Sequence, residues 1–185
     1  MFALALRHAF VAIAFTLVTG YSFAQPSPAP AARGAVPTPR AEVQANLAQL
    51  MRGILYPASN IVFAAQSDNP ADIKPAQTPS TATDLLTSTY GKWQAVENSA
   101  LAIVEAANLL VLPGRKCSNG RDVPLRNKDW SQFVQELREA GMTAYKAAQT
   151  KNTDNILTAA DPLTMACSNC HEKYREKPDL SDRCK

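Results

Sequence analysis

Residues 167–175 of this 185-residue chain read CSNCHEKYR, and the first five have the C-x-x-C-H spacing that attaches a c-type haem covalently. Two thiols at this spacing, Cys167 and Cys170, can each add to one vinyl group of the macrocycle. His171 follows directly and would then lie beneath the ring to bind the iron from the proximal side. The stretch therefore predicts one covalently attached haem c per chain.

The N-terminus predicts export, which covalent haem attachment requires because it takes place outside the cytoplasm. Arg7 and His8 form a short positive region, residues 9–19 are apolar, and residues 22–24 carry the small residues that a signal peptidase reads. We expect residues 1–24 to be a signal peptide cleaved after Ala24, and the mature protein to be periplasmic. Cleavage would leave His171 as the only histidine.

The rest of the N-terminal region gives no sign of a membrane segment or a nucleic-acid surface. The apolar run is well short of the roughly 20 residues that span a bilayer, so we expect no stable membrane insertion after cleavage. Five prolines among Ala, Ser and Thr indicate a linker over residues 25–40. Residues 41–185 then form one haem-binding domain. The net charge is only +3 and no basic run occurs, which excludes nucleic acid as an expected partner.

Apolar residues recur at helical spacing in four stretches, over residues 41–66, 89–112, 130–150 and 153–176. Pro57 predicts a kink or a break after Leu55, since proline frees a helix carbonyl. Asp129 is the expected N-cap of the third stretch. Pro162 is expected to begin a fresh helix with Asp161 as its cap, or to kink the fourth stretch. No strand-like alternation is visible, so the predicted fold is all-α, an antiparallel four-helix bundle.

The haem motif is predicted to lie on the buried face of the last helix. At about 100° per residue, the two cysteines, His171 and Tyr174 fall within the arc that Ile156 and Leu163 define. A C-x-x-C-H sequence that arose by chance could fall on any face of the helix. Its place on the buried face therefore supports a genuine haem-attachment motif.

Residues 167–175 also fit the C-x-x-C-H-x-x-Y-R pattern near the C-terminus of the cytochrome c prime family, which the chain resembles. The motif match is specific, while the likeness over residues 41–176 is one of architecture. The resemblance implies a four-helix bundle of the cytochrome c prime type, with the haem between helices, His171 proximal and a first-helix residue distal. It also implies that Tyr174 and Arg175 contact the haem, Arg175 balancing a propionate. The alternative is a solvated Arg175 favoured by the helix dipole.

The distal residue decides between two functions that the resemblance implies. Some members of this superfamily leave the iron five-coordinate and bind NO or CO, whereas others use a first-helix methionine and transfer electrons. Met51 lies on the apolar stripe of the first helix and is the candidate distal ligand, although methionine also commonly fills cores. Leu47, one turn earlier, is the candidate apolar distal residue of a gas-binding site. Met142 is expected to face outward, and Met165 lies too close to Cys167 to reach the opposite face.

The family's common first-helix pattern has an arginine one turn before the distal position. Val43 or Leu47 stands at that place here, so the chain departs from the pattern and the alignment of this helix stays open.

Two further cysteines, Cys117 and Cys184, are not used by the haem motif. In an exported chain they most simply pair, which would tie the loop after the second helix to the C-terminal tail. Two unpaired thiols are the alternative. A zinc site is disfavoured because these cysteines are isolated, and a dithiol oxidoreductase because its strand and helix context is missing.

These observations favour a non-enzymatic haem protein. With its one mature histidine committed to iron, the chain can assemble no Ser/His/Asp or Cys/His catalytic set. The expected partners are periplasmic redox proteins or a small gas ligand. A haem-bearing subunit of a larger redox complex, tethered by the proline-rich segment, is a third reading. A homodimer also stays open, because an apolar stripe facing haem looks like one facing a second subunit.

Overall fold

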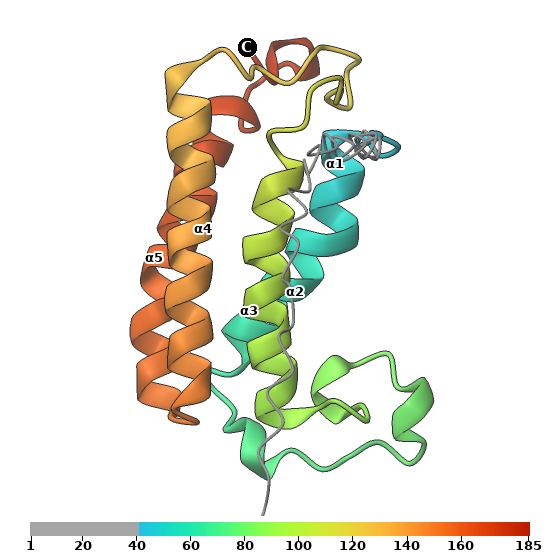
Figure 1. Cartoon of the computed structure of the whole chain (residues 1–185), viewed down its shortest axis with the longest axis vertical. Coiled ribbons are helices and arrows are strands. Elements are labelled where there is room, and N and C mark those ends of the chain that lie inside the picture. Colours follow the sequence, from blue (N-terminus) through green and yellow to red (C-terminus); the bar gives the residue numbers. More distant parts are fainter. Residues whose placement is uncertain (1–40) are drawn as a thin grey trace, which may run out of the picture. The chain divides into compact units, whose positions relative to one another are not determined.

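The computed structural model describes residues 41–185, so the signal peptide and linker predicted for residues 1–24 and 25–40 lie outside the described residues. The described part is all-α, as predicted, and contains no β-strand. Its helical elements are α1 (Leu47–Leu50), the π-helical turn η1 (Met51–Leu55), α2 (Tyr56–Ala64), α3 (Lys92–Leu109), α4 (Lys128–Gln149) and α5 (Thr153–Tyr174). Because α1, η1 and α2 follow without interruption, they form one first helix (Figure 1).

The first helix begins six residues later than predicted. Asn46 is its N-cap: the Asn46 side chain accepts a hydrogen bond from the Gln49 amide, and the Gln49 side chain accepts one from the Asn46 amide. This capping box satisfies two amide groups that a helix start leaves without partners. The capping box therefore sets the start of the helix at Leu47. Residues 41–46 were predicted to be helical but are not.

Pro57 does not break the first helix after Leu55. The chain instead forms the π-helical turn Met51–Leu55, in which the Tyr56 amide donates to the Met51 carbonyl. Pro57 then falls in the first turn of α2, where its missing N–H costs little. The predicted irregularity thus takes the form of one widened turn, and the helix continues to Ala64.

The N-cap predicted for the third helix is wrong. α4 begins at Lys128 with Asn127 as its N-cap, and Asp129 lies inside the first turn. The Asp129 side chain is engaged elsewhere, because its Oδ1 accepts a hydrogen bond from the Tyr174 hydroxyl. An acidic side chain in a first turn is still favourable to the helix dipole.

Pro162 starts no fresh helix, and α5 runs through it to Tyr174. Asn152 caps the beginning, with its side chain accepting from the amides of Asp154 and Asn155. Pro162 and Thr158 are both exposed, so water can reach the Thr158 carbonyl that the proline leaves without a partner.

The helices pack in the order α2, α3, α4, α5, and α2 also contacts α5. Figure 1 shows each of these helices running opposite to the one before it. Small residues let α3 and α4 approach closely: Gly141 has no room for a side chain, since an added Cβ would lie 2.8 Å from Val104 Cγ2. Bulkier side chains, including the fully buried Trp130, Ile103, Ile156 and Leu163, fill the interior between the helices.

One end of this helical unit is closed by the loop after α3 and by the C-terminal tail. Buried Arg115 donates to the Leu109 carbonyl (3.0 Å) and to the Ala45 carbonyl (2.5 Å), which fastens the loop to the end of α3 and to the start of the first helix. Burial lowers the pKa of Arg115. Within residues 41–185, no helix has the length and apolar character needed to cross a membrane.

Candidate functional site

A mostly apolar cavity of about 480 Å³ lies between the first helix and α5, a volume typical of ligand sites. Side chains of α3 and α4 complete its walls, among them Trp130 and Phe133. The loop and tail at the closed end contribute Cys117, Arg183 and Cys184. The cavity therefore joins segments that are far apart in the sequence.

Every residue predicted to serve the haem lines this one cavity. From the C-terminal motif come Cys167, Cys170, His171, Tyr174 and Arg175, and from the first helix come Leu47 and Met51. The structure thus places the two candidate distal residues and the C-x-x-C-H motif around the same space. Met142 and Met165 do not line it; Met165 is exposed, whereas Met142 is half-buried rather than turned fully outward.

Cys167 and Cys170 are half-buried and not bonded to one another. Burial raises the pKa of Cys167. Burial also raises the pKa of Cys170 to about 12, with further contributions from Cys167, Asp129 and Glu136. Both groups are therefore protonated thiols at neutral pH. A dithiol oxidoreductase needs a thiol of lowered pKa, so this environment does not suit that chemistry.

His171 is half-buried and neutral at neutral pH. Burial, followed by the charge of Arg175, lowers the pKa of the imidazole, while Glu176 acts weakly in the other direction. Arg175 Nη1 lies 3.2 Å from His171 Nδ1. Because a guanidinium only donates, this contact requires Nδ1 to be the acceptor nitrogen. A neutral imidazole is the form that binds a metal.

Tyr174 joins the motif to the start of α4. Its hydroxyl donates to Asp129 Oδ1 (2.5 Å) and accepts from Asn127 Nδ2 (3.1 Å). Its ring meets those of Trp130 and Phe133 edge-on, with centroids 5.1 and 6.2 Å away. Burial, then the hydrogen bond to Asp129, raises the pKa of Tyr174 to about 12. Tyr174 is therefore a fixed part of the cavity wall.

Met51 and Leu47 are both half-buried, so each has contact with the core and with the cavity. Met51 is the first residue of the π-helical turn. Such single turns are rare and frequently occur at functional sites. Leu47 stands at the first position of α1, just after its cap.

The predicted disulfide between Cys117 and Cys184 is present and links residues 67 positions apart. Both of its cysteines line the cavity, which the sequence did not indicate. It also brings Arg183 to the cavity. Arg183 was not predicted as a site residue, and the only signal for it is its place beside Cys184.

No family model matches the chain, and neither the curated proteins nor the solved structures contain a significant match. Among residues 41–185, no three His, Cys, Asp or Glu side chains are grouped as a metal ion held by side chains alone would require. The functional assignment therefore depends on the chemistry of the cavity.

Proposed function

We propose that the protein is a periplasmic monohaem c-type cytochrome of the cytochrome c prime type, an antiparallel four-helix bundle that transfers electrons. One observation carries the proposal: Cys167, Cys170 and His171 of α5 face the same apolar cavity as Met51 of the first helix. When bound, the haem supplies an iron that cycles between the ferrous and ferric states.

The cavity residues fit the chemistry of a haem, which has an apolar ring and two carboxylates. Phe63, Phe133 and Trp130 offer apolar surface to the ring. Arg175 and Arg183 also line the cavity and can meet carboxylates. Arg183 Nε in particular is buried with no hydrogen-bond partner.

Cys167 and Cys170 would hold the haem by thioether bonds. In each addition the sulfur bonds one vinyl carbon and the thiol hydrogen goes to the other, so a C=C bond is consumed and no electrons are gained or lost overall. The reactants are thiols, and the raised pKa values of both groups keep them in that form.

His171 would bind the iron through Nε2, which places its proton on Nδ1. Arg175 could not then stay 3.2 Å from Nδ1, because two donors would face each other. With Nδ1 protonated, the Arg175 guanidinium would be free to pair with a propionate from its place on the cavity wall. Nδ1 would take a carbonyl, carboxylate or water as its acceptor.

Met51 as distal ligand favours electron transfer, because a Met/His pair raises the reduction potential. The π-helical turn that begins at Met51 supports this choice. The alternative is a five-coordinate protein that binds NO or CO, with Leu47 covering the distal face. It is supported by the half-buried position of Leu47 on the same cavity.

The test is the spin state of the purified holoprotein. We expect a low-spin absorbance spectrum in both oxidation states, converted to high-spin by Met51→Ala. Met165→Ala is the matched control, because Met165 is exposed and does not line the cavity, and it should leave the spectrum unchanged. A wild-type protein whose ferrous form is high-spin and binds CO readily would reject Met51 ligation and favour the gas-binding alternative.

A further inference from the structure

Arg183 carries the one buried side-chain nitrogen or oxygen without a hydrogen-bond partner in residues 41–185. The atom is Nε, and the residue lines the cavity that we assign to the haem. Arg183 also takes part in none of the ion pairs formed within these residues. Its Nε–H donor is therefore buried without a partner, while the residue as a whole is half-buried.

The position of Arg183 is fixed by its neighbours. The disulfide holds Cys184 to Cys117, and the Cys184 amide donates to the Tyr174 carbonyl (2.9 Å). The Arg183 carbonyl accepts from Asn119 Nδ2 (3.1 Å), and the Ser181 carbonyl accepts from Arg121 Nε (2.9 Å). The tail is thus fastened to α5 and to the loop after α3 on both sides of Arg183.

A buried donor without an acceptor costs about 1–3 kcal/mol, and more when it is charged. The Arg183 side chain is only half-buried, so its guanidinium could avoid this cost by turning toward water. We infer that Arg183 is held at the cavity because its acceptor arrives with the ligand. The geometry points to a carboxylate, which a guanidinium binds through two parallel hydrogen bonds.

This inference rests on the proposed function, in which the carboxylate is a haem propionate. Arg183 then does two things. It would pair with a propionate that is otherwise partly buried without a partner, and it would add a positive charge at the haem. The reduced haem carries one more electron than the oxidised haem, so this charge favours reduction.

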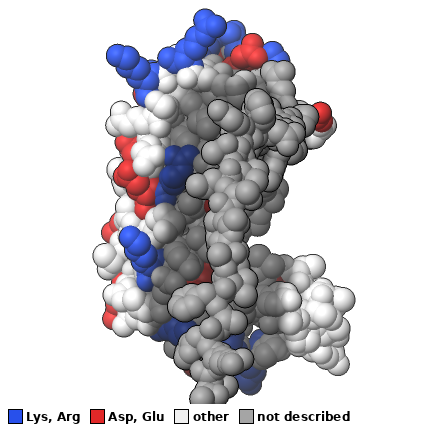
Figure 2. Space-filling view, viewed as in Figure 1, with Lys and Arg blue, Asp and Glu red and all other residues white. Residues whose placement is uncertain are grey.

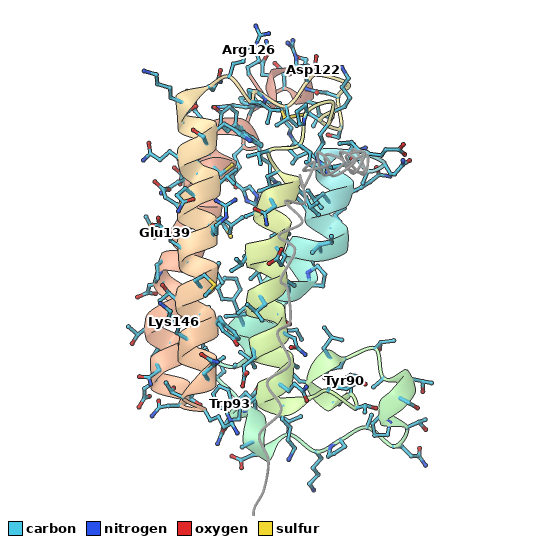
Figure 3. The ribbon with its side chains drawn as sticks, viewed as in Figure 1. Tyr90, Trp93, Asp122, Arg126, Glu139 and Lys146 are labelled. Atoms are coloured by element: carbon cyan, nitrogen blue, oxygen red, sulfur yellow. A yellow bond between two sulfur atoms is a disulfide. The ribbon has the colours of Figure 1, made fainter. Side chains whose placement is uncertain are left out.

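The experiment compares midpoint potentials of the holoprotein and of variants, measured by spectroelectrochemistry. Arg183→Gln should shift the redox equilibrium at least threefold toward the oxidised form, which is about 28 mV at 59 mV per tenfold for one electron. Arg126→Gln is the matched control, because it removes the same charge from the same end of the unit. Arg126 is exposed and does not line the cavity (Figure 3).

Arg183→Lys keeps the charge but loses the planar fork, so its potential should lie between those of the wild type and Arg183→Gln. It also serves as the test variant if Arg183→Gln fails to fold. Raising the salt concentration should reduce the effect of Arg126→Gln more than that of Arg183→Gln, since buried pairs are screened less.

Equal potentials for Arg183→Gln and Arg126→Gln in a haem-loaded protein would overturn the role of Arg183 alone. So would a wild-type potential in Arg183→Lys if Arg183→Gln does not fold. A wild-type chain that carries no covalent haem would overturn the proposed function and this inference together.

Discussion

Tyr174 is the residue through which the haem motif is joined to α4. Its hydroxyl group bonds to Asp129 and Asn127, and the residue is buried. We expect Tyr174→Phe to lower the free energy of unfolding by about 1–2 kcal/mol, since two part-buried hydrogen bonds are lost and one of them is to a carboxylate. Urea unfolding measures this. Tyr90→Phe, at an exposed tyrosine, is the control, and an equal effect in both variants would show that the hydrogen bonds of Tyr174 do not stabilise the fold.

The same residue gives stability a dependence on alkaline pH. The pKa of Tyr174 is about 12 in the folded protein, against about 10 for an unfolded tyrosine. The fold therefore favours the protonated phenol, whose contribution is complete below pH 10 and is lost as the pH rises through 12. Between pH 10 and 12, the free energy of unfolding should fall more steeply with pH for the wild type than for Tyr174→Phe. An equal dependence on pH in the two proteins would show that Tyr174 does not cause the loss of stability at alkaline pH.

Side chains on a regular helix could be placed from the sequence, whereas those beyond it could not. Cys167, Cys170 and His171 line the cavity because the helical repeat puts them on one face with buried Leu163. Arg183 lies after the end of α5, where no repeat applies. The disulfide between Cys184 and the loop after α3 sets the position of Arg183. Predicting that two cysteines pair does not show which neighbouring residues will lie at a cavity.

At the scale of elements, the close contact between α3 and α4 depends on Gly141. An added Cβ would lie 2.8 Å from Val104 Cγ2 and 3.3 Å from Ile103 Cγ2. Overpacking costs about 1–3 kcal/mol, and the better helix propensity of alanine returns about 1 kcal/mol. We expect Gly141→Ala to lower the free energy of unfolding by about 1 kcal/mol on balance.

Gly53 is the matched control, since it is also helical but has nothing within 4 Å of an added Cβ. Gly53→Ala should raise the free energy of unfolding by about 0.5–1 kcal/mol. Thermal and urea unfolding of both variants measure the difference. If Gly141→Ala were as stable as Gly53→Ala, α3 and α4 would not pack as closely as described.

Element boundaries were harder to predict than the elements themselves. The starts of the first helix and of α4 were misplaced because side-chain contacts set them: Asn46 forms a capping box with Gln49, and Asp129 bonds to Tyr174 instead of capping α4. Pro57 signalled an irregularity, but the choice of a π-helical turn over a break depends on packing of the whole first helix. These boundaries depend on contacts between particular side chains, which cannot be predicted from the spacing of apolar residues.

Across the described residues, charge is distributed unevenly. Residues 115–129 and 171–185, which meet at the closed end, carry ten Lys or Arg and six Asp or Glu. The remaining described residues, 41–114 and 130–170, carry six Lys or Arg and ten Asp or Glu. Figure 2 shows basic side chains gathered at the closed end. The C-x-x-C-H motif therefore lies near the positive end, and the net charge there would stay positive with the two propionates of the proposed haem.

This distribution predicts how the protein exchanges electrons with small redox reagents. Oxidation of the reduced protein by an anionic iron complex such as hexacyanoferrate should slow as ionic strength rises, because salt screens the attraction. Oxidation by a cationic cobalt complex should not slow. Stopped-flow absorbance measures both rates. Equal salt dependence for the two reagents would show that the basic end does not steer the reaction.

We propose that Cys167 and Cys170 bind one haem covalently, and intact-mass spectrometry would detect that bond. The full chain is expressed in a host that exports it and attaches c-type haem, and the mass of the purified protein is measured under denaturing conditions. We expect the mass of the polypeptide plus one haem for the wild type, and the mass of the polypeptide alone for the Cys167→Ala, Cys170→Ala double variant. A wild-type protein of polypeptide mass alone would contradict the proposal.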